Sequence, residues 1–313
     1  MNRKWIKQII FPLVAAVIWG SAFVFQSEGA EHIGPFTFNM VRCAMACLFL
    51  GLVLLIRDLW KKYNIRDCAK KSGEQKRDIK ALLLGGVLCG SVLACASNLQ
   101  QFALGSTSPG KTAFITSLYV VLVAVLGLFL GKRVRPIIWI GIVLAMVGMY
   151  FLCVTEELRI EKGDFAVLLC AACFACHIMV IDRVSSRVNG VELSFVQFLV
   201  VSLESAIGML LTEVPTLEAI VACLWPLVYV GVFSGGIAYT LQILAQKGSN
   251  PTVVSLLLSL ESVFAVLTAG LLTGEWMTRR EWIGCVLMLI AVILAQLPDG
   301  IFLRKKKAIG TES

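Results

Sequence analysis

Long apolar stretches dominate the chain, and short segments that carry charges, prolines or glycines separate them. An α-helix needs about 20 predominantly apolar residues to cross the hydrocarbon core of a bilayer, and most of the stretches reach that length. The pattern predicts ten membrane-spanning helices, at about residues 8–27, 35–56, 79–103, 109–130, 136–154, 164–182, 192–212, 222–244, 251–273 and 281–298. The predicted fold class is therefore an all-α integral membrane protein.

The composition agrees with this pattern. Of the 313 residues, 58% are hydrophobic and 15% are charged, whereas soluble domains average about 45–50% and about 25%. The mean hydropathy is +0.85. These values exclude a disordered chain, a disulfide-rich secreted domain and a large soluble catalytic domain.

The net charge of +8 is explained by membrane topology. With a cytoplasmic N-terminus, 22 lysines and arginines fall on the inner side of the predicted spans and five on the outer side. Such a bias is typical of cytoplasmic loops. We expect a multi-pass plasma-membrane protein with both termini in the cytoplasm, whose basic loops face anionic inner-leaflet lipid. We expect no nucleic-acid partner and infer no obligate protein partner.

The chain also resembles itself. A constant offset places Leu99-Gln100 on Leu241-Gln242, Pro109 on Pro251, and Ser117-Leu118 on Ser259-Leu260; an offset larger by one places Trp139-Ile140-Gly141 on Trp282-Ile283-Gly284. We predict two five-helix repeats, residues 1–155 and 156–300, followed by a basic cytoplasmic tail, residues 301–313. Because five is odd, equivalent helices would run in opposite directions, an inverted repeat that lets a central site open to either side.

Several stretches resemble the EamA-type members of the drug/metabolite transporter superfamily. They are Trp19-Gly20-Ser21-Ala22-Phe23, residues 35–42, Ser117-Leu118-Tyr119-Val120-Val121, and residues 260–265 running to Gly274-Glu275. The resemblance implies a ten-helix carrier for small metabolites, often an exporter, with a central cavity. In one departure, the first half has Gly131-Lys132 where many relatives have Gly-Glu.

Two motifs suggest chemistry that their setting does not support. Residues 105–112 match the phosphate-binding P-loop pattern, but an apolar helix rather than a strand precedes them, and we expect a turn followed by a helix that begins at Pro109. Residues 173–177 match the haem-attachment pattern Cys-x-x-Cys-His inside a predicted span. Cysteine is a common packing residue in such helices, so we predict no cofactor and no metal site.

Three charges fall within predicted spans and are the first candidates for function: Arg42, Glu204 and Glu261. A charge at the bilayer centre costs at least about 2.5–3.5 kcal/mol on insertion scales, so each must face a cavity or a partner. A structural ion pair is the alternative for each. If Glu261 exchanges protons near neutral pH, transport could be coupled to protons.

Polar and aromatic side chains on the same helices complete the predicted substrate site: Trp19, Asn39, Asn98, Gln101, Tyr119, His177, Gln197, Tyr239 and Gln242. This mixture suits a zwitterionic amino acid, and also a nucleobase or a drug-like cation. We expect a secondary transporter rather than an enzyme, with an exporter of amino acids or related compounds as the first choice. A membrane-embedded lipid-modifying enzyme and an organic-cation efflux carrier remain the alternatives.

Overall fold

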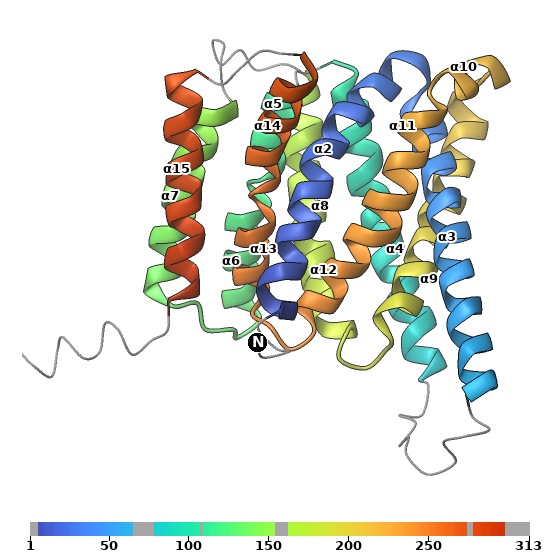
Figure 1. Ribbon diagram of the computed structural model, residues 1–313, viewed down its shortest axis with the longest axis horizontal. Helices are drawn as coiled ribbons and strands as arrows, with labels where there is room; N and C mark the ends of the chain where they lie inside the picture. The colour runs from blue at the N-terminus through green and yellow to red at the C-terminus, as the bar shows by residue number, and fades with distance from the viewer. Residues whose placement is uncertain (1–5, 65–77, 107–108, 154–161, 274–277, 298–313) are drawn as a thin grey trace, which may run out of the picture.

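Residues 6–64, 78–106, 109–153, 162–273 and 278–297 are described in the computed structural model, and all their regular elements are helices (Figure 1). They are η1 (Ile6–Ile10), α2 (Phe11–His32), α3 (Pro35–Asn64), α4 (Ile79–Leu104), α5 (Pro109–Thr116), α6 (Tyr119–Phe129), α7 (Pro136–Cys153), α8 (Lys162–Val184), α9 (Gly190–Thr212), α10 (Leu217–Ala222), α11 (Leu224–Val228), η2 (Tyr229–Ala238), α12 (Tyr239–Gln246), α13 (Pro251–Leu258), α14 (Glu261–Thr273) and α15 (Arg279–Gln296). The all-α prediction is confirmed. The predicted tail and the Gly274-Glu275 motif lie outside the described residues.

Eight helices of the described chain are long and apolar enough to cross a membrane. Five are η1–α2, α3, α4, α8 and α9, and three are composites: α5–α6, α11–η2–α12 and α13–α14. The apolar helix α7 is shorter, and α15 begins with the charged run Arg279-Arg280-Glu281. The protein is a multi-pass membrane protein, while the count of ten spans stays a prediction.

The bundle exposes an apolar surface and buries polar side chains within a largely apolar core. Large aliphatic side chains point outward from α4, α9 and α15, among them Leu84, Leu203, Ile207 and Ile293. Buried polar side chains include Gln26, Asn39, Gln101, Gln197 and Gln246. Polar groups inside a membrane protein must find partners or line a cavity, because lipid offers none. The buried polar residues are therefore the ones to examine for partners or for a place on a cavity wall.

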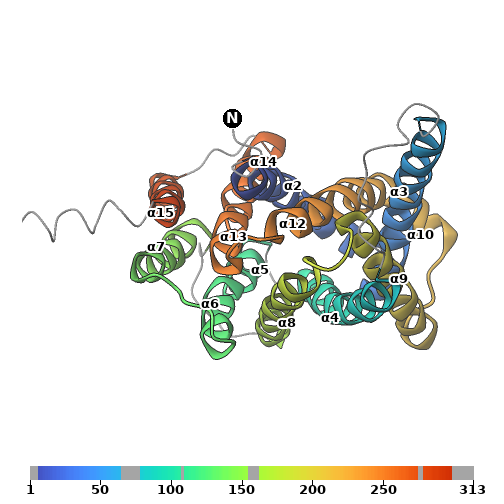
Figure 2. The ribbon, with the colours of Figure 1, turned by 90° about the horizontal axis from the view of Figure 1, so that it is seen from below.

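The helices pack in pairs around this interior. Figure 2 shows α7 and α15 together at one end of the bundle and α3, α9 and α10 at the other. Helix α4 packs against α8 and α9, and α2 packs against α14. Helices from the first predicted repeat thus lie beside helices from the second.

Two of the composite helices are interrupted at matching places. Helices α5 and α13 each have eight residues and begin at a proline, Pro109 and Pro251, and each is followed by a two-residue turn, Ser117-Leu118 and Ser259-Leu260. The backbone bridges each turn by bonds to the third preceding residue, such as Val120 N–H to Ser117 O (3.1 Å) and Ser262 N–H to Ser259 O (3.2 Å). The two breaks occupy equivalent positions when the chain is aligned with itself.

Two glycines allow close helix approaches that bring residues of the interior together. A Cβ on Gly20 of α2 would lie 2.6 Å from Glu261 O and 2.7 Å from Ala265 N of α14. A Cβ on Gly231 of η2 would lie 2.7 Å from Arg42 O of α3. Small residues at such crossings let backbones meet directly. Gly20 and Gly231 thus place the α14 and α3 backbones at the interior.

We predict that Gly20→Ala destabilises the protein by about 1–3 kcal/mol, the usual cost of overpacking. The added methyl group would meet backbone atoms of α14, which cannot rotate away. Thermal unfolding in detergent would show a lowered melting temperature. The matched control is Gly51→Ala, whose Cβ would lie 3.5 Å from the Phe195 ring, an ordinary contact. Equal melting temperatures for the two variants would contradict the prediction.

Candidate functional site

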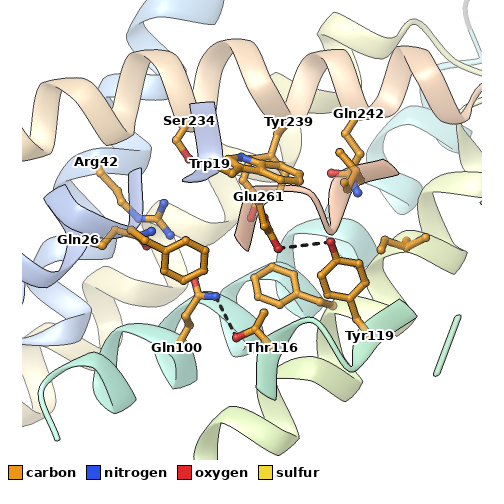
Figure 3. Close-up of a pocket in the computed structure, with 14 residues that line it drawn as sticks. Trp19, Gln26, Arg42, Gln100, Thr116, Tyr119, Ser234, Tyr239, Gln242 and Glu261 are labelled. Carbon is orange, nitrogen blue, oxygen red and sulfur yellow. Dashed lines mark hydrogen bonds between the residues drawn. The ribbon is translucent and has the colours of Figure 1, made fainter. Parts of the chain in front are cut away.

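A pocket lies where the two interrupted helices meet α2, α3, α4, α8 and α12 (Figure 3). Its lining residues are Trp19, Phe23, Gln26, Arg42, Gln100, Thr116, Tyr119, Phe174, Ile178, Ser234, Tyr239, Gln242, Leu258 and Glu261. Five are aromatic, one is a base and one is an acid. The pocket thus combines apolar walls with a few polar groups, the usual composition of small-molecule sites.

The two helix breaks contact each other at this pocket. Tyr119, the first residue of α6, donates its hydroxyl proton to Glu261 Oε1 (3.3 Å), and Glu261 is the first residue of α14. Beside them, the hydroxyl oxygens of Ser117 and Ser262 are 3.2 Å apart. Three pairs of lining residues share one separation along the chain, that of the internal alignment: Gln100 with Gln242, Thr116 with Leu258, and Tyr119 with Glu261.

The two charges of the pocket are not paired with each other. Among the described residues, Arg42 makes one hydrogen bond, from Nε to Asn39 Oδ1 (2.5 Å), and forms no ion pair. Glu261 likewise has only the Tyr119 hydroxyl as a side-chain partner within the described chain. Arg42 is 4% exposed and Glu261 5% exposed. Each charge therefore keeps the capacity to bind a ligand group of opposite sign.

Two further polar atoms at the pocket lack a partner among the described residues. They are the indole Nε1 of Trp19, a donor, and the amide Oε1 of Gln242, an acceptor. Buried polar groups are nearly always hydrogen-bonded, so unsatisfied ones need an explanation. Both residues line the pocket, and among the described residues unpartnered polar atoms also occur away from it, at His177 Nδ1 and Gln197 Nε2.

Aromatic rings form one wall of the pocket around Tyr239. The ring centroids of Tyr239 and Trp19 are 4.7 Å apart in a tilted arrangement. Behind Tyr239 lie Phe198 at 5.4 Å and His177 at 6.0 Å, both edge-to-face. Edge-to-face and tilted arrangements are the favourable geometries for aromatic pairs. These contacts hold the Tyr239 and Trp19 rings against the pocket.

Half of the predicted site residues line the pocket and half do not. Trp19, Arg42, Tyr119, Tyr239, Gln242 and Glu261 line it; Asn39, Asn98, Gln101, His177, Gln197 and Glu204 lie elsewhere. The residues of the second set bond to protein groups: Asn39 to Asn98, Gln101 to Gln26 O, His177 to Gln197, and Glu204 to the Ser91 hydroxyl. Each of these six residues lies on a polar face of its helix. That face is turned toward a neighbouring helix, which supplies the hydrogen-bond partner, and not toward the pocket.

The prediction did not include several further residues that line the pocket, among them Phe23, Gln100, Phe174, Ile178, Ser234 and Leu258. A signal for Gln100 was present, because it aligns with Gln242 in the comparison of the chain with itself. Apolar lining residues such as Phe174 and Ile178 carry no such signal, since packing residues look the same. The described residues hold no group of three or more His, Cys, Asp or Glu side chains arranged for a metal ion.

Comparisons with known proteins identify relatives of this chain. The model of the EamA-like transporter family matches residues 6–154 and again residues 161–297. An "Uncharacterized transporter" of Archaeoglobus fulgidus is 30% identical over 91% of this chain and 84% of its own length. The "Uncharacterized inner membrane transporter YedA" of Escherichia coli K12 is 21% identical over 91% of this chain and 89% of its own. A crystal structure superposes with a TM-score of 0.74 over 92% of this chain and 96% of its own, at 16% identity, and supports the fold.

We predict that Gln197 serves stability rather than ligand contact. Gln197→Leu would leave His177 Nε2 buried without its 3.1 Å partner, and an unsatisfied buried group costs about 1–3 kcal/mol. Chemical denaturation in detergent would show the loss. Because removing both partners can be nearly neutral, the double variant His177→Phe, Gln197→Leu should recover most of it. A double variant as unstable as the sum of the two single variants would contradict this assignment.

Proposed function

Because the chain belongs to the EamA-like transporter family, we propose that it is a secondary transporter that moves a small metabolite out of the cell by alternating access. The pocket between the interrupted helices is the proposed substrate site. Export as the direction rests on the family resemblance alone. No covalent chemistry is involved in this proposal, so lipid turnover by the purified protein would contradict it.

The crossing of the two interrupted helices is the observation that carries the proposal. Helices α5–α6 and α13–α14 begin at matching prolines, break at matching turns and touch at Tyr119–Glu261 and Ser117–Ser262. Discontinuous helices at a central site are a recurrent feature of carriers built from inverted repeats. The constant offset, the matching breaks and the double family match support the proposal that residues 1–155 and 156–300 are two such repeats.

The pocket chemistry favours an amino acid or a related compound as the substrate. The Arg42 guanidinium suits a carboxylate, the Glu261 carboxylate suits an ammonium group, and the ring faces of Trp19 and Tyr239 suit an apolar or aromatic side chain. An organic cation is the second candidate, because the Glu261 carboxylate and the aromatic rings could bind it without a contribution from Arg42. A comparison of the two charge-removing variants separates these candidates.

The setting that we propose is the plasma membrane, with both ends of the chain in the cytoplasm. The distribution of Lys and Arg supports this orientation. Exposed Lys61 and Lys62 at the end of α3 would then face anionic lipid of the inner leaflet.

Counterflow in proteoliposomes tests the proposal. Vesicles would be loaded with one unlabelled pool of amino acids, nucleobases, polyamines or organic cations, and the entry of a matching tracer would be followed. We expect transient tracer accumulation for the amino-acid pool without any ion gradient. Arg42→Gln and Glu261→Gln should each lower the rate at least about tenfold, since each removes a charged hydrogen-bond partner.

Glu204→Gln is the matched control for Glu261→Gln. It makes the same carboxylate-to-amide change at a half-buried side chain outside the pocket. The amide oxygen can still accept from the Ser91 hydroxyl, so the rate should stay close to that of the wild type. Loss of counterflow in Glu204→Gln with retention in Glu261→Gln would contradict the assignment of the site. An organic cation is indicated if Arg42→Gln still exchanges and Glu261→Gln does not.

We further propose that Glu261 couples transport to protons. It is the only acidic residue among the described residues that line the pocket. A carboxylate that is exposed alternately to the two sides of the membrane could carry a proton across it. Wild-type transport should then respond to an imposed pH gradient, and Glu261→Gln should not respond, because an amide binds no proton. The measurement is tracer flux with and without the gradient. An equal response in both proteins would contradict the coupling.

A further inference from the structure

A chain of hydrogen bonds leads from the pocket to a helix on the far side of α3 and α4. Arg42 Nε donates to Asn39 Oδ1 (2.5 Å), and Asn39 Nδ2 donates to Asn98 Oδ1 (2.9 Å). Asn98 Nδ2 in turn donates to Ser205 Oγ (3.0 Å) and to Ala94 O (2.9 Å). We call Asn39, Asn98 and Ser205 the Arg42 relay. It connects α3, α4 and α9 and ends at Arg42.

The relay fixes one side of the guanidinium and leaves the other side to the pocket. Asn39 and Ser205 are fully buried, and neither lines the pocket. Arg42 lines it and makes no other hydrogen bond within the described chain than the one from Nε. Its two terminal nitrogens therefore carry the donors that remain for a ligand. Figure 3 shows the guanidinium between Gln26 and the centre of the pocket.

The relay consists entirely of neutral groups. An acidic residue at position 39 would also accept from Arg42, but it would lack the donor to Asn98 and would neutralise the guanidinium, so that the charge could no longer attract an anion. An amide acceptor holds the side chain and keeps the positive charge. Removing a charge from water without a partner of opposite sign is strongly unfavourable. Such a site is therefore completed by a ligand that brings the missing negative charge, and planar guanidinium groups match carboxylates in two parallel hydrogen bonds.

We propose that Asn39, Asn98 and Ser205 are positioning residues that hold Arg42 as the receptor for a carboxylate group of the substrate. The inference deepens the proposed function and rests on it, because it names the group of the substrate that this end of the pocket binds. The relay residues act through Arg42 and do not touch the ligand. Two residues predicted from the sequence to bind substrate, Asn39 and Asn98, are thereby given this positioning role.

Ligand binding to the purified protein tests the proposal without requiring transport. The probes are L-phenylalanine and L-phenylalaninamide, which share the ammonium group and the ring and differ only in the carboxylate. Titration calorimetry in detergent should show that the wild-type protein prefers phenylalanine, and that Arg42→Gln has lost the preference. Ser205→Ala and Asn98→Ala should weaken phenylalanine binding by about 3- to 10-fold, the effect of one hydrogen bond, and leave the amide unaffected.

Ser202→Ala is the matched control. Ser202 also lies on α9 and donates a hydrogen bond to α3, to Met40 O at 3.0 Å, but it is outside the relay. The Ser202→Ala variant should bind both probes with the affinities of the wild type. Damage to packing would weaken both probes alike, so only the ratio of the two affinities reports on Arg42. Asn39→Asp is a second test. It keeps an acceptor for Arg42 Nε, removes the Nδ2 donor to Asn98 Oδ1 and neutralises the Arg42 charge, so it should abolish the preference for the carboxylate.

The outcomes separate this inference from the proposed function. The absence of a carboxylate preference in the wild type, or equal ratios in Ser205→Ala, Asn98→Ala and Ser202→Ala, would overturn the relay. A preserved relay effect in a protein that exchanges no amino acid across vesicles would contradict the transport proposal and leave the binding role of Arg42 intact. Counterflow of an organic cation at the same rate in Arg42→Gln and in the wild type would support transport and contradict the role of Arg42 as a carboxylate receptor.

Discussion

The interior of this protein is organised by two charges that share a buried pocket and, within the described chain, do not form an ion pair with each other. In a bilayer neither charge can escape to water, so the surrounding structure must stabilise both where they are. Arg42 is held by neutral amides and Glu261 by a tyrosine hydroxyl. The close helix approaches at Gly20 and Gly231 place the backbones of Glu261 and Arg42 at this pocket.

The fold class and part of the site could be predicted from the sequence, for one physical reason. A charge or a large aromatic residue in the middle of an apolar span has few acceptable environments, so Arg42, Glu261, Trp19 and Tyr119 could be recognised individually. The amides are different. A stripe of polar residues shows which face of a helix is polar, but a neighbouring amide satisfies it as well as a cavity does. For that reason the sequence predicts Asn98, His177 and Gln197 beside the substrate, whereas the structure pairs them with protein groups and the pocket is lined by other residues.

The helix breaks could not be predicted from local pattern. Neither Ser117-Leu118 nor Ser259-Leu260 contains a proline or a glycine, and the apolar periodicity continues through both turns. The two breaks are in contact with each other, and at the second one the Ser259 hydroxyl donates to Leu256 O (2.8 Å), so that a side chain enters the helical hydrogen-bond ladder. The internal similarity did mark the positions, because the two dipeptides are identical. The same similarity aligns Gln100 with Gln242 and so marks Gln100 as a candidate for the pocket. The helical face of the third predicted span, taken alone, favours Gln101.

The chemical difference between paired positions of the pocket has an energetic consequence. If every pair were identical, a carrier with two interchangeable halves would have the same free energy when empty whether it faced inward or outward. The pairs differ at two places, Tyr119 against Glu261 and Thr116 against Leu258. Glu261 belongs to the second half only. Its surroundings therefore change when the two halves exchange conformations. A difference of about 1.4 kcal/mol already gives a tenfold bias in population. In a carrier that alternates as proposed above, the chemical asymmetry of these two pairs would contribute to the free-energy difference between the inward-facing and the outward-facing state of the unloaded protein.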